Sequence, residues 1–164
     1  MQEAFELAEK LKPRLRSAFQ QELLAASLQS AAHVGNPLRL NNFSASFREL
    51  FRHVFLALAP DQQVASCRWF KPDPTARGKA TRAQKVSFVV HGGMDPDYVQ
   101  DELGIDVEQE CATLLKVIDC LSKFTHVNQQ SFGSPADVVE HQVVEACRAM
   151  ASFLDSADEA RTLL

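Results

Sequence analysis

Two arginines, a glutamate and a histidine lie close together in the run Arg48-Glu-Leu-Phe-Arg-His53, inside a predicted helix. Glu49 and His53 are about 40° apart around a regular helix, so the carboxylate can pair with the imidazole and orient it. An imidazole that moves protons, beside a guanidinium that offsets charge on phosphorane oxygens, suits phosphoryl transfer from a ribose 2′-OH without a metal. The candidate catalytic residues are therefore Arg48 and His53, with Glu49 and Arg52 in support.

The same residue types also occur on any solvated helix face, where such pairs add only tenths of a kcal/mol. Arg48 and His53 are about 140° apart on a regular helix. Their side chains would therefore meet only at an edge of the helix, at a distortion or across an interface between two copies of the chain.

Apolar residues recur at helical steps through most of the 164-residue chain, which predicts an all-α bundle in a single domain, residues 1–164. We expect four long helices, two short helices and a basic loop. The first long helix carries an apolar stripe that includes Phe5, Phe19 and Leu24, and Pro13 either kinks this helix or makes it restart. The other long helices are one from Asn41 or Asn42 to about Ala59, one from Asp106 to Phe124 or His126, and one from Ser134-Pro135 onward. The first short helix is 82–91, with a Thr81–Gln84 capping box and Gly92-Gly93 behind it, although Val86, Phe88 and Val90 also alternate as in a strand. The second runs from Pro96 to Leu103 before Gly104. The polar tail reaches Leu164 without a stop signal, so the chain is expected to be the N-terminal part of a longer protein.

The basic loop, residues 66–85, carries six basic residues against the single acid Asp73, a net charge of +5 in a chain of −4. Cations that hold phosphates beside aromatic rings that stack on unpaired bases are typical of single-strand binding. Alternatively, Trp69 and Phe70 tuck under the loop as a small apolar cluster. The candidate nucleic-acid-binding residues are Arg68, Trp69, Lys71, Arg77, Lys79, Arg82 and Lys85.

Composition excludes several other classes of protein. No run of about 18 apolar residues is present, which argues against a membrane span, and the charged N-terminus lacks a secretory signal. The net charge of −4 excludes a uniformly cationic nucleic-acid coat. The four cysteines have no zinc-ligand spacing, so we expect reduced thiols in a cytoplasmic protein without a metal or other cofactor.

A helical bundle with R-x4-H, as in Arg48–His53, resembles the HEPN superfamily of small all-α domains. Many HEPN domains are metal-independent endoribonucleases of prokaryotic toxin and antiviral systems, and they act as dimers with the motif at the shared face. The resemblance implies RNA as substrate or ligand, a homodimer, His53 as acid–base and Arg48 as phosphate stabiliser. HEPN nucleases often carry RNxxxH late in the bundle, where this chain has Leu121, Ser122 and His126; Lys123 and His126 are secondary candidates.

Residues 36–155 are also similar to bacterial proteins that carry a predicted nuclease domain associated with prokaryotic Piwi-like (pPIWI) proteins. The similarity lies in the run from Leu40 through Val54, Ala59-Pro-Asp61, the basic loop, Gly92-Gly93 and the segment from Leu121 to His126. It implies that the nuclease domain follows this region. Because leucine stands at position 121, the alternative is a non-catalytic module that dimerises, senses nucleic acid through residues 68–85, or docks an effector domain or partner protein.

Overall fold

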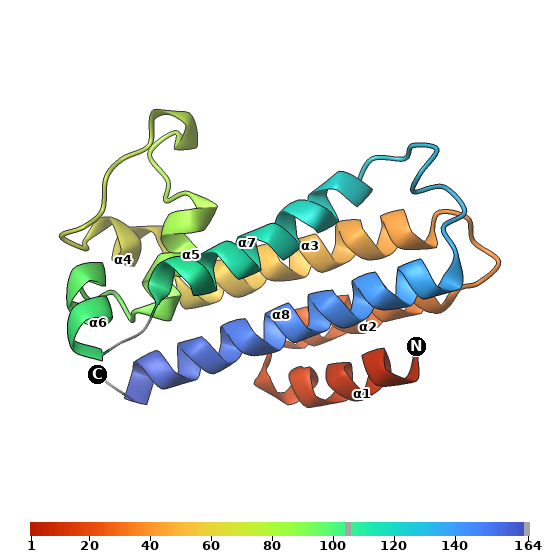
Figure 1. Cartoon of the computed structure of the whole chain (residues 1–164), viewed down its shortest axis with the longest axis horizontal. Helices are drawn as coiled ribbons and strands as arrows, with labels where there is room; N and C mark the ends of the chain where they lie inside the picture. The colour runs from red at the N-terminus through yellow and green to blue at the C-terminus, as the bar shows by residue number, and fades with distance from the viewer. Residues whose placement is uncertain (104–105, 163–164) are drawn as a thin grey trace. The chain divides into compact units, whose positions relative to one another are not determined.

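The structure, a computed structural model, describes residues 1–103 and 106–162, and these residues form helices and connecting turns without a β-strand (Figure 1). The all-α prediction is therefore confirmed. The eight α-helices are α1 (Gln2–Leu11), α2 (Ala18–Ala32), α3 (Arg39–Leu58), α4 (Asp61–Ala65), α5 (Arg82–Val90), α6 (Pro96–Leu103), α7 (Val107–Phe124) and α8 (Ala136–Thr162). Two short 3₁₀ helices, η1 (Lys12–Arg14) and η2 (Pro74–Ala76), lie in connecting segments. Gly104 and Leu164, named above as a helix stop and an open end, lie outside the described residues.

The described residues group into two compact units, and the expectation of one domain stays a prediction. Unit 1 comprises Met1–Val54 and Lys116–Ala151, and unit 2 comprises Phe55–Leu115 and Ser152–Leu164. Helices α3, α7 and α8 each contribute residues to both units. Among the described residues, no helix has both the length and the apolar composition that crossing a membrane requires.

The core of unit 1 is built on the apolar face of α3. Phe43, Phe47 and Phe51 are buried, and their rings contact one another in sequence, with centroids 5.1 and 5.6 Å apart. Burial of each such ring contributes about 1.5–3 kcal/mol. Helices α7 and α8 add buried Ile118, Leu121, Val143 and Met150.

Polar contacts fix the neighbours of α3 within unit 1. The Asn41 amide donates to the carbonyl oxygens of Phe124 and His126 at 2.8 and 3.3 Å, which ties the start of α3 to the end of α7. Cys120 of α7 contacts Gln142 of α8, and Glu3 of α1 forms an ion pair with Arg148 of α8. Unit 1 is thus a bundle of helices held around α3.

One helix start differs from the sequence prediction, and a second one decides between two predicted alternatives. Helix α3 begins at Arg39 rather than at Asn41 or Asn42, because the Asn36 carboxamide accepts the Leu38 N–H at 2.9 Å and opens the helix earlier. The interruption at Pro13 is a complete restart: α1 ends at Leu11, and Ser17 caps α2 by accepting the Gln20 N–H at 3.2 Å.

Unit 2 packs the short helices around the ends of α3 and α8. Phe55 and Phe153 meet edge to face at 5.1 Å, and both are buried. The predicted Thr81–Gln84 capping box opens α5, which excludes the strand that Val86, Phe88 and Val90 could otherwise form. Helix α5 ends at Val90, followed by Gly92 and Gly93 at φ +62° and +81°, values that favour glycine.

All four cysteines carry free thiols. Cys147 is buried in unit 1 and Cys111 in unit 2, whereas Cys67 and Cys120 are half-buried. Burial raises the pKa of the Cys147 thiol to about 12.

Candidate functional site

Arg52 is the centre of the polar cluster on α3. Its Nε donates to Glu49 Oε2 at 2.6 Å, and its Nη2 lies 2.9 Å from His53 Nε2. One guanidinium therefore bridges a carboxylate and an imidazole. The cluster lies entirely within unit 1, and the His53 side chain is half-buried.

The contact with Arg52 is compatible with one tautomer of the neutral His53 ring. A guanidinium has only N–H donors, so Nε2 must accept and the proton of the neutral ring sits on Nδ1. The lone pair of Nε2 is thus directed at a positive charge. This arrangement brings an imidazole and a guanidinium to one point, and these two groups suit phosphoryl transfer from a hydroxyl.

Helix α2 supplies two further contacts to His53. The Phe19 ring meets the imidazole edge to face at 4.9 Å, and Gln20 Nε2 donates to the His53 carbonyl oxygen at 3.1 Å. Sequence reasoning placed Phe19 in a buried stripe, but 53% of its surface is exposed. Helical spacing could have shown this. The buried residues Leu28 and Leu24 are four positions apart, and a further step of four leads to Gln20, so Phe19 lies off the buried face of α2.

The other two candidate residues on α3 lie differently from the prediction. Glu49 was expected to pair with His53, but it pairs with Arg52, the residue three positions on. The Arg48 side chain is half-buried and makes no hydrogen bond or ion pair with a described residue. On a regular helix it lies one turn before Arg52 on the same side. The structure therefore joins Arg52, not Arg48, to the imidazole.

The basic loop belongs to unit 2, and its cations differ in exposure. Arg68, Lys71, Arg77, Lys79 and Arg82 are exposed. Lys85, in contrast, is buried: its Nζ lies 2.9 Å from Asp61 Oδ1 and 3.3 Å from the Ala59 carbonyl oxygen. The hydrogen bond from Lys85 lowers the pKa of Asp61. Lys85 thus serves the packing of α5 on α4, and its ammonium is not presented to a nucleic acid.

Trp69 is half-buried and held at two points. Its Nε1 donates to the Gly93 carbonyl oxygen at 3.4 Å, and its ring meets His91 edge to face at 4.9 Å. His91 is fully buried, and neither ring nitrogen has a hydrogen-bond partner. Burial lowers the pKa of His91 to about 4. The structure therefore combines the two alternatives for Trp69, since the ring is anchored yet part of it remains exposed.

The secondary candidates Lys123 and His126 are exposed at and just beyond the end of α7. The His126 carbonyl oxygen accepts from Asn41 and Ser131, a structural role of the backbone. Leu121, which stands where the late HEPN motif has arginine, is buried in the core of unit 1. Neither secondary candidate contacts Arg52 or His53.

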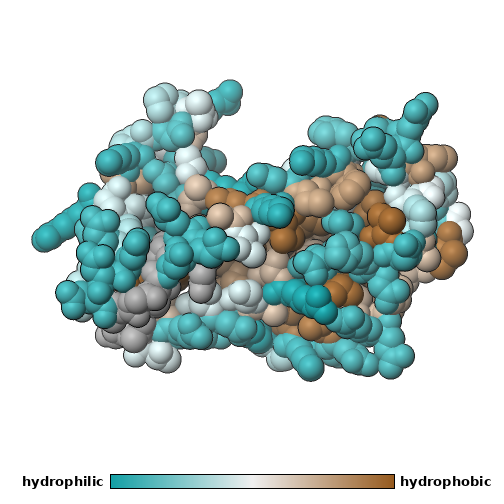
Figure 2. Space-filling view, viewed as in Figure 1, coloured by the Kyte–Doolittle hydropathy of each residue, from teal (hydrophilic) through white to brown (hydrophobic). Residues whose placement is uncertain are grey.

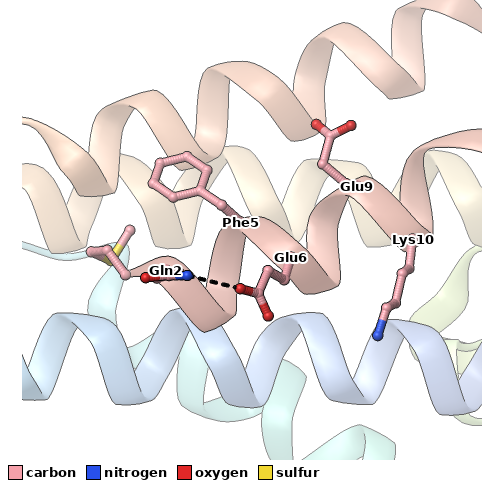
Figure 3. A pocket seen from close by; sticks show the side chains of 6 residues that line it. Gln2, Phe5, Glu6, Glu9 and Lys10 are labelled. Atoms are coloured by element: carbon pink, nitrogen blue, oxygen red, sulfur yellow. Dashed lines mark hydrogen bonds between the residues drawn. The ribbon is translucent and has the colours of Figure 1, made fainter.

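Other parts of the described chain offer little chemistry. No group of three or more histidine, cysteine or acidic side chains that could hold a metal ion occurs among the residues with described placement. An open hollow on α1 is lined by Met1, Gln2, Phe5, Glu6, Glu9 and Lys10, with Gln2 Nε2 donating to Glu6 Oε1 at 3.1 Å (Figure 3). All six come from α1 and from Met1, the residue before it, and they bring no acid–base pair together.

Comparison with known proteins identifies the class. A family model described as a predicted pPIWI-associating nuclease matches residues 12–150. The chain belongs to this family. The match falls on the described bundle itself, whereas the resemblance had implied a nuclease domain beyond it. No curated protein and no solved structure matches the chain.

Proposed function

We propose that the chain is a metal-independent endoribonuclease of HEPN type, acting in a cytoplasmic prokaryotic antiviral or toxin system. The observation that supports it best is the 2.9 Å contact between Arg52 Nη2 and His53 Nε2 in a chain of a predicted nuclease family. The two side chains needed for cleavage through a ribose 2′-OH thereby lie at one point on α3.

In the proposed reaction, an RNA phosphate takes the Arg52 donors and frees Nε2 of His53. Nε2 accepts the 2′-OH proton while the 2′ oxygen forms a bond to phosphorus and the bond from phosphorus to the 5′ oxygen breaks. The protonated His53 then gives this proton to the leaving 5′ oxygen, which regenerates the neutral imidazole, and the products are a 2′,3′-cyclic phosphate and a 5′-OH. The guanidinium offsets the negative charge on the phosphorane oxygens.

Glu49 acts through Arg52 as a positioning residue, because its carboxylate fixes the guanidinium at 2.6 Å. Arg48, one turn earlier, supplies a second cation for the substrate backbone. A homodimer completes the proposal: the exposed Phe19 ring beside His53 gives a second copy of the chain an apolar contact at the site. Light scattering should then show a dimer that Phe19→Ser weakens, and a monomeric wild type would contradict this part.

RNA cleavage in EDTA tests the proposal. We expect His53→Ala to lower the rate about 10²–10⁴-fold, the usual range for loss of a general acid–base group. His141→Ala, which removes an exposed histidine of α8, is the matched control and should cleave like the wild type. Equal activity of wild type and His53→Ala, no activity in either, or activity that needs an added metal would contradict the proposal.

Buried Leu121 favours one alternative function. Since the late HEPN motif has no arginine here, the domain could serve as a non-catalytic module that docks an effector or partner. Under this alternative, His53→Ala leaves the cellular phenotype intact, whereas Phe19→Ser abolishes it.

A further inference from the structure

The basic loop concentrates positive charge in an acidic protein. Because the chain has a net charge of −4 and residues 66–85 carry +5, the remaining residues carry −9. Five of the six cations of the loop are exposed. Hydrophilic and neutral side chains cover this segment, between α4 and α5, in the space-filling view (Figure 2). The surface of unit 2 therefore has one strongly cationic region.

Acidic neighbours leave most of this charge uncompensated. The Asp73 carboxylate is engaged by a neighbouring residue of the loop: its Oδ1 accepts from Thr75 N at 2.7 Å and from Thr75 Oγ1 at 2.6 Å. These hydrogen bonds lower the pKa of Asp73. Asp61 pairs with buried Lys85. Arg68, Lys71 and Arg77 make no side-chain hydrogen bond or ion pair with the described residues.

The backbone of the loop is fixed at several points. Gln84 Nε2 donates to the Lys71 carbonyl oxygen at 2.6 Å, and the Ala80 N–H donates to Asp61 Oδ1 at 3.0 Å. Arg77 adopts the left-handed conformation at φ +50°, rare for a residue other than glycine, and this turns the chain after η2. A fixed loop loses less conformational entropy on binding than a flexible one.

Trp69 gives this surface a flat aromatic group between Arg68 and Lys71. Its N–H donates to the Gly93 carbonyl oxygen and its ring contacts His91, while the side chain as a whole stays half-exposed, so part of it remains accessible to a ligand. Stacking of an unpaired base on such a ring contributes about 1–3 kcal/mol. An aromatic platform flanked by cations fits unpaired bases with their phosphates better than a lipid surface or an acidic peptide.

We propose that the basic loop is a single-stranded nucleic-acid-binding surface, with Trp69 as a base platform and Arg68, Lys71, Arg77, Lys79 and Arg82 as phosphate contacts. This proposal rests on the proposed function in one respect, namely that the polyanion bound by the loop is a nucleic acid. The surface binds a strand whether or not His53 cleaves it, so the two proposals can fail separately.

Fluorescence anisotropy of a labelled 12-nucleotide 2′-O-methyl RNA measures binding alone, because this probe has no free 2′-OH to attack. Five phosphate contacts predict a slope of about −3.5 for log Kobs against log salt, at about −0.7 per contact. The double variant Lys71→Gln/Lys79→Gln should reduce the slope to about −2 and weaken binding about 25-fold at 0.1 M salt.

The matched control, Lys12→Gln/Lys116→Gln, removes two exposed lysines outside the loop and changes the net charge equally. It should bind with nearly the wild-type slope. Equal losses in both double variants would overturn the proposal in favour of a general charge effect, and salt-independent binding would exclude phosphate contacts.

Trp69 is the single tryptophan of the chain, so its fluorescence reports base stacking directly. We expect the RNA to quench it and polyglutamate or anionic phospholipid vesicles to leave it unchanged. Quenching by polyglutamate or the vesicles as strong as that by RNA would overturn the assignment to nucleic acid. Binding of RNA without any change in Trp69 fluorescence would overturn its role as a platform.

Discussion

Mild acid should destabilise unit 2 through His91. Burial lowers its pKa in the folded protein to about 4, against about 6.5 in the unfolded chain. The unfolded state therefore binds the proton more tightly than the folded state. The contribution of His91 to the free energy of unfolding is complete only above pH 6.5. The stability that His91 contributes falls as the pH drops from 6.5 towards 4, by about 1.4 kcal/mol per unit. Between pH 7 and pH 5, the loss is about 2 kcal/mol.

Urea unfolding followed by Trp69 fluorescence measures this loss, because the indole contacts His91 directly. The variant His91→Leu removes the titrating group together with two buried nitrogens that lack partners, so its stability should hardly change between pH 7 and pH 5. The matched control His141→Leu removes an exposed histidine and should retain the wild-type pH dependence. If His91→Leu and the wild type lost equal stability on acidification, the reasoning would be refuted. Asp61 and Asp73, whose pKa values are lowered, lose their contribution only at more acidic pH.

Two further substitutions test the packing of unit 2, with thermal unfolding as the measurement. Gly93→Ala should cost about 1–3 kcal/mol, because a Cβ there would lie 3.0 Å from Phe88 at a φ of +81°; an unchanged melting temperature would contradict the close approach. Asp61→Asn should cost about 2 kcal/mol by leaving the buried Lys85 ammonium without its charge partner, and Lys85→Met in the same background should recover part of the loss. No recovery would mean that the ion pair is not the source of the cost.

Local signals predicted much of the fold. The Thr81–Gln84 capping box opens α5 as expected, and Gly92-Gly93 follows its end, since caps depend on residues only a few positions apart. The start of α3 was missed because the prediction took Asn41 or Asn42 as the N-cap, whereas Asn36 accepts the Leu38 N–H in the turn before them.

The candidate site was harder to predict because its contacts compete. Glu49 can reach either the residue three positions on or the one four positions on, and helical geometry permits both; the structure selects Arg52. Lys85 was predicted to be one more solvated cation of the basic loop. Its partner Asp61 is distant in the sequence, and a local sequence pattern cannot predict such an ion pair. The exposure of Phe19 depends on how α2 is rotated about its axis. Packing against the core sets this rotation, and the apolar pattern of the sequence alone does not.

Each unit contains one buried thiol, and its rate of alkylation measures how often that unit opens. Cys147 lies in unit 1 and Cys111 in unit 2, and an alkylating reagent reaches either only when the surrounding helices part. Timed alkylation followed by peptide mass spectrometry would therefore report the rate of local opening in each unit, without a mutation or an added probe.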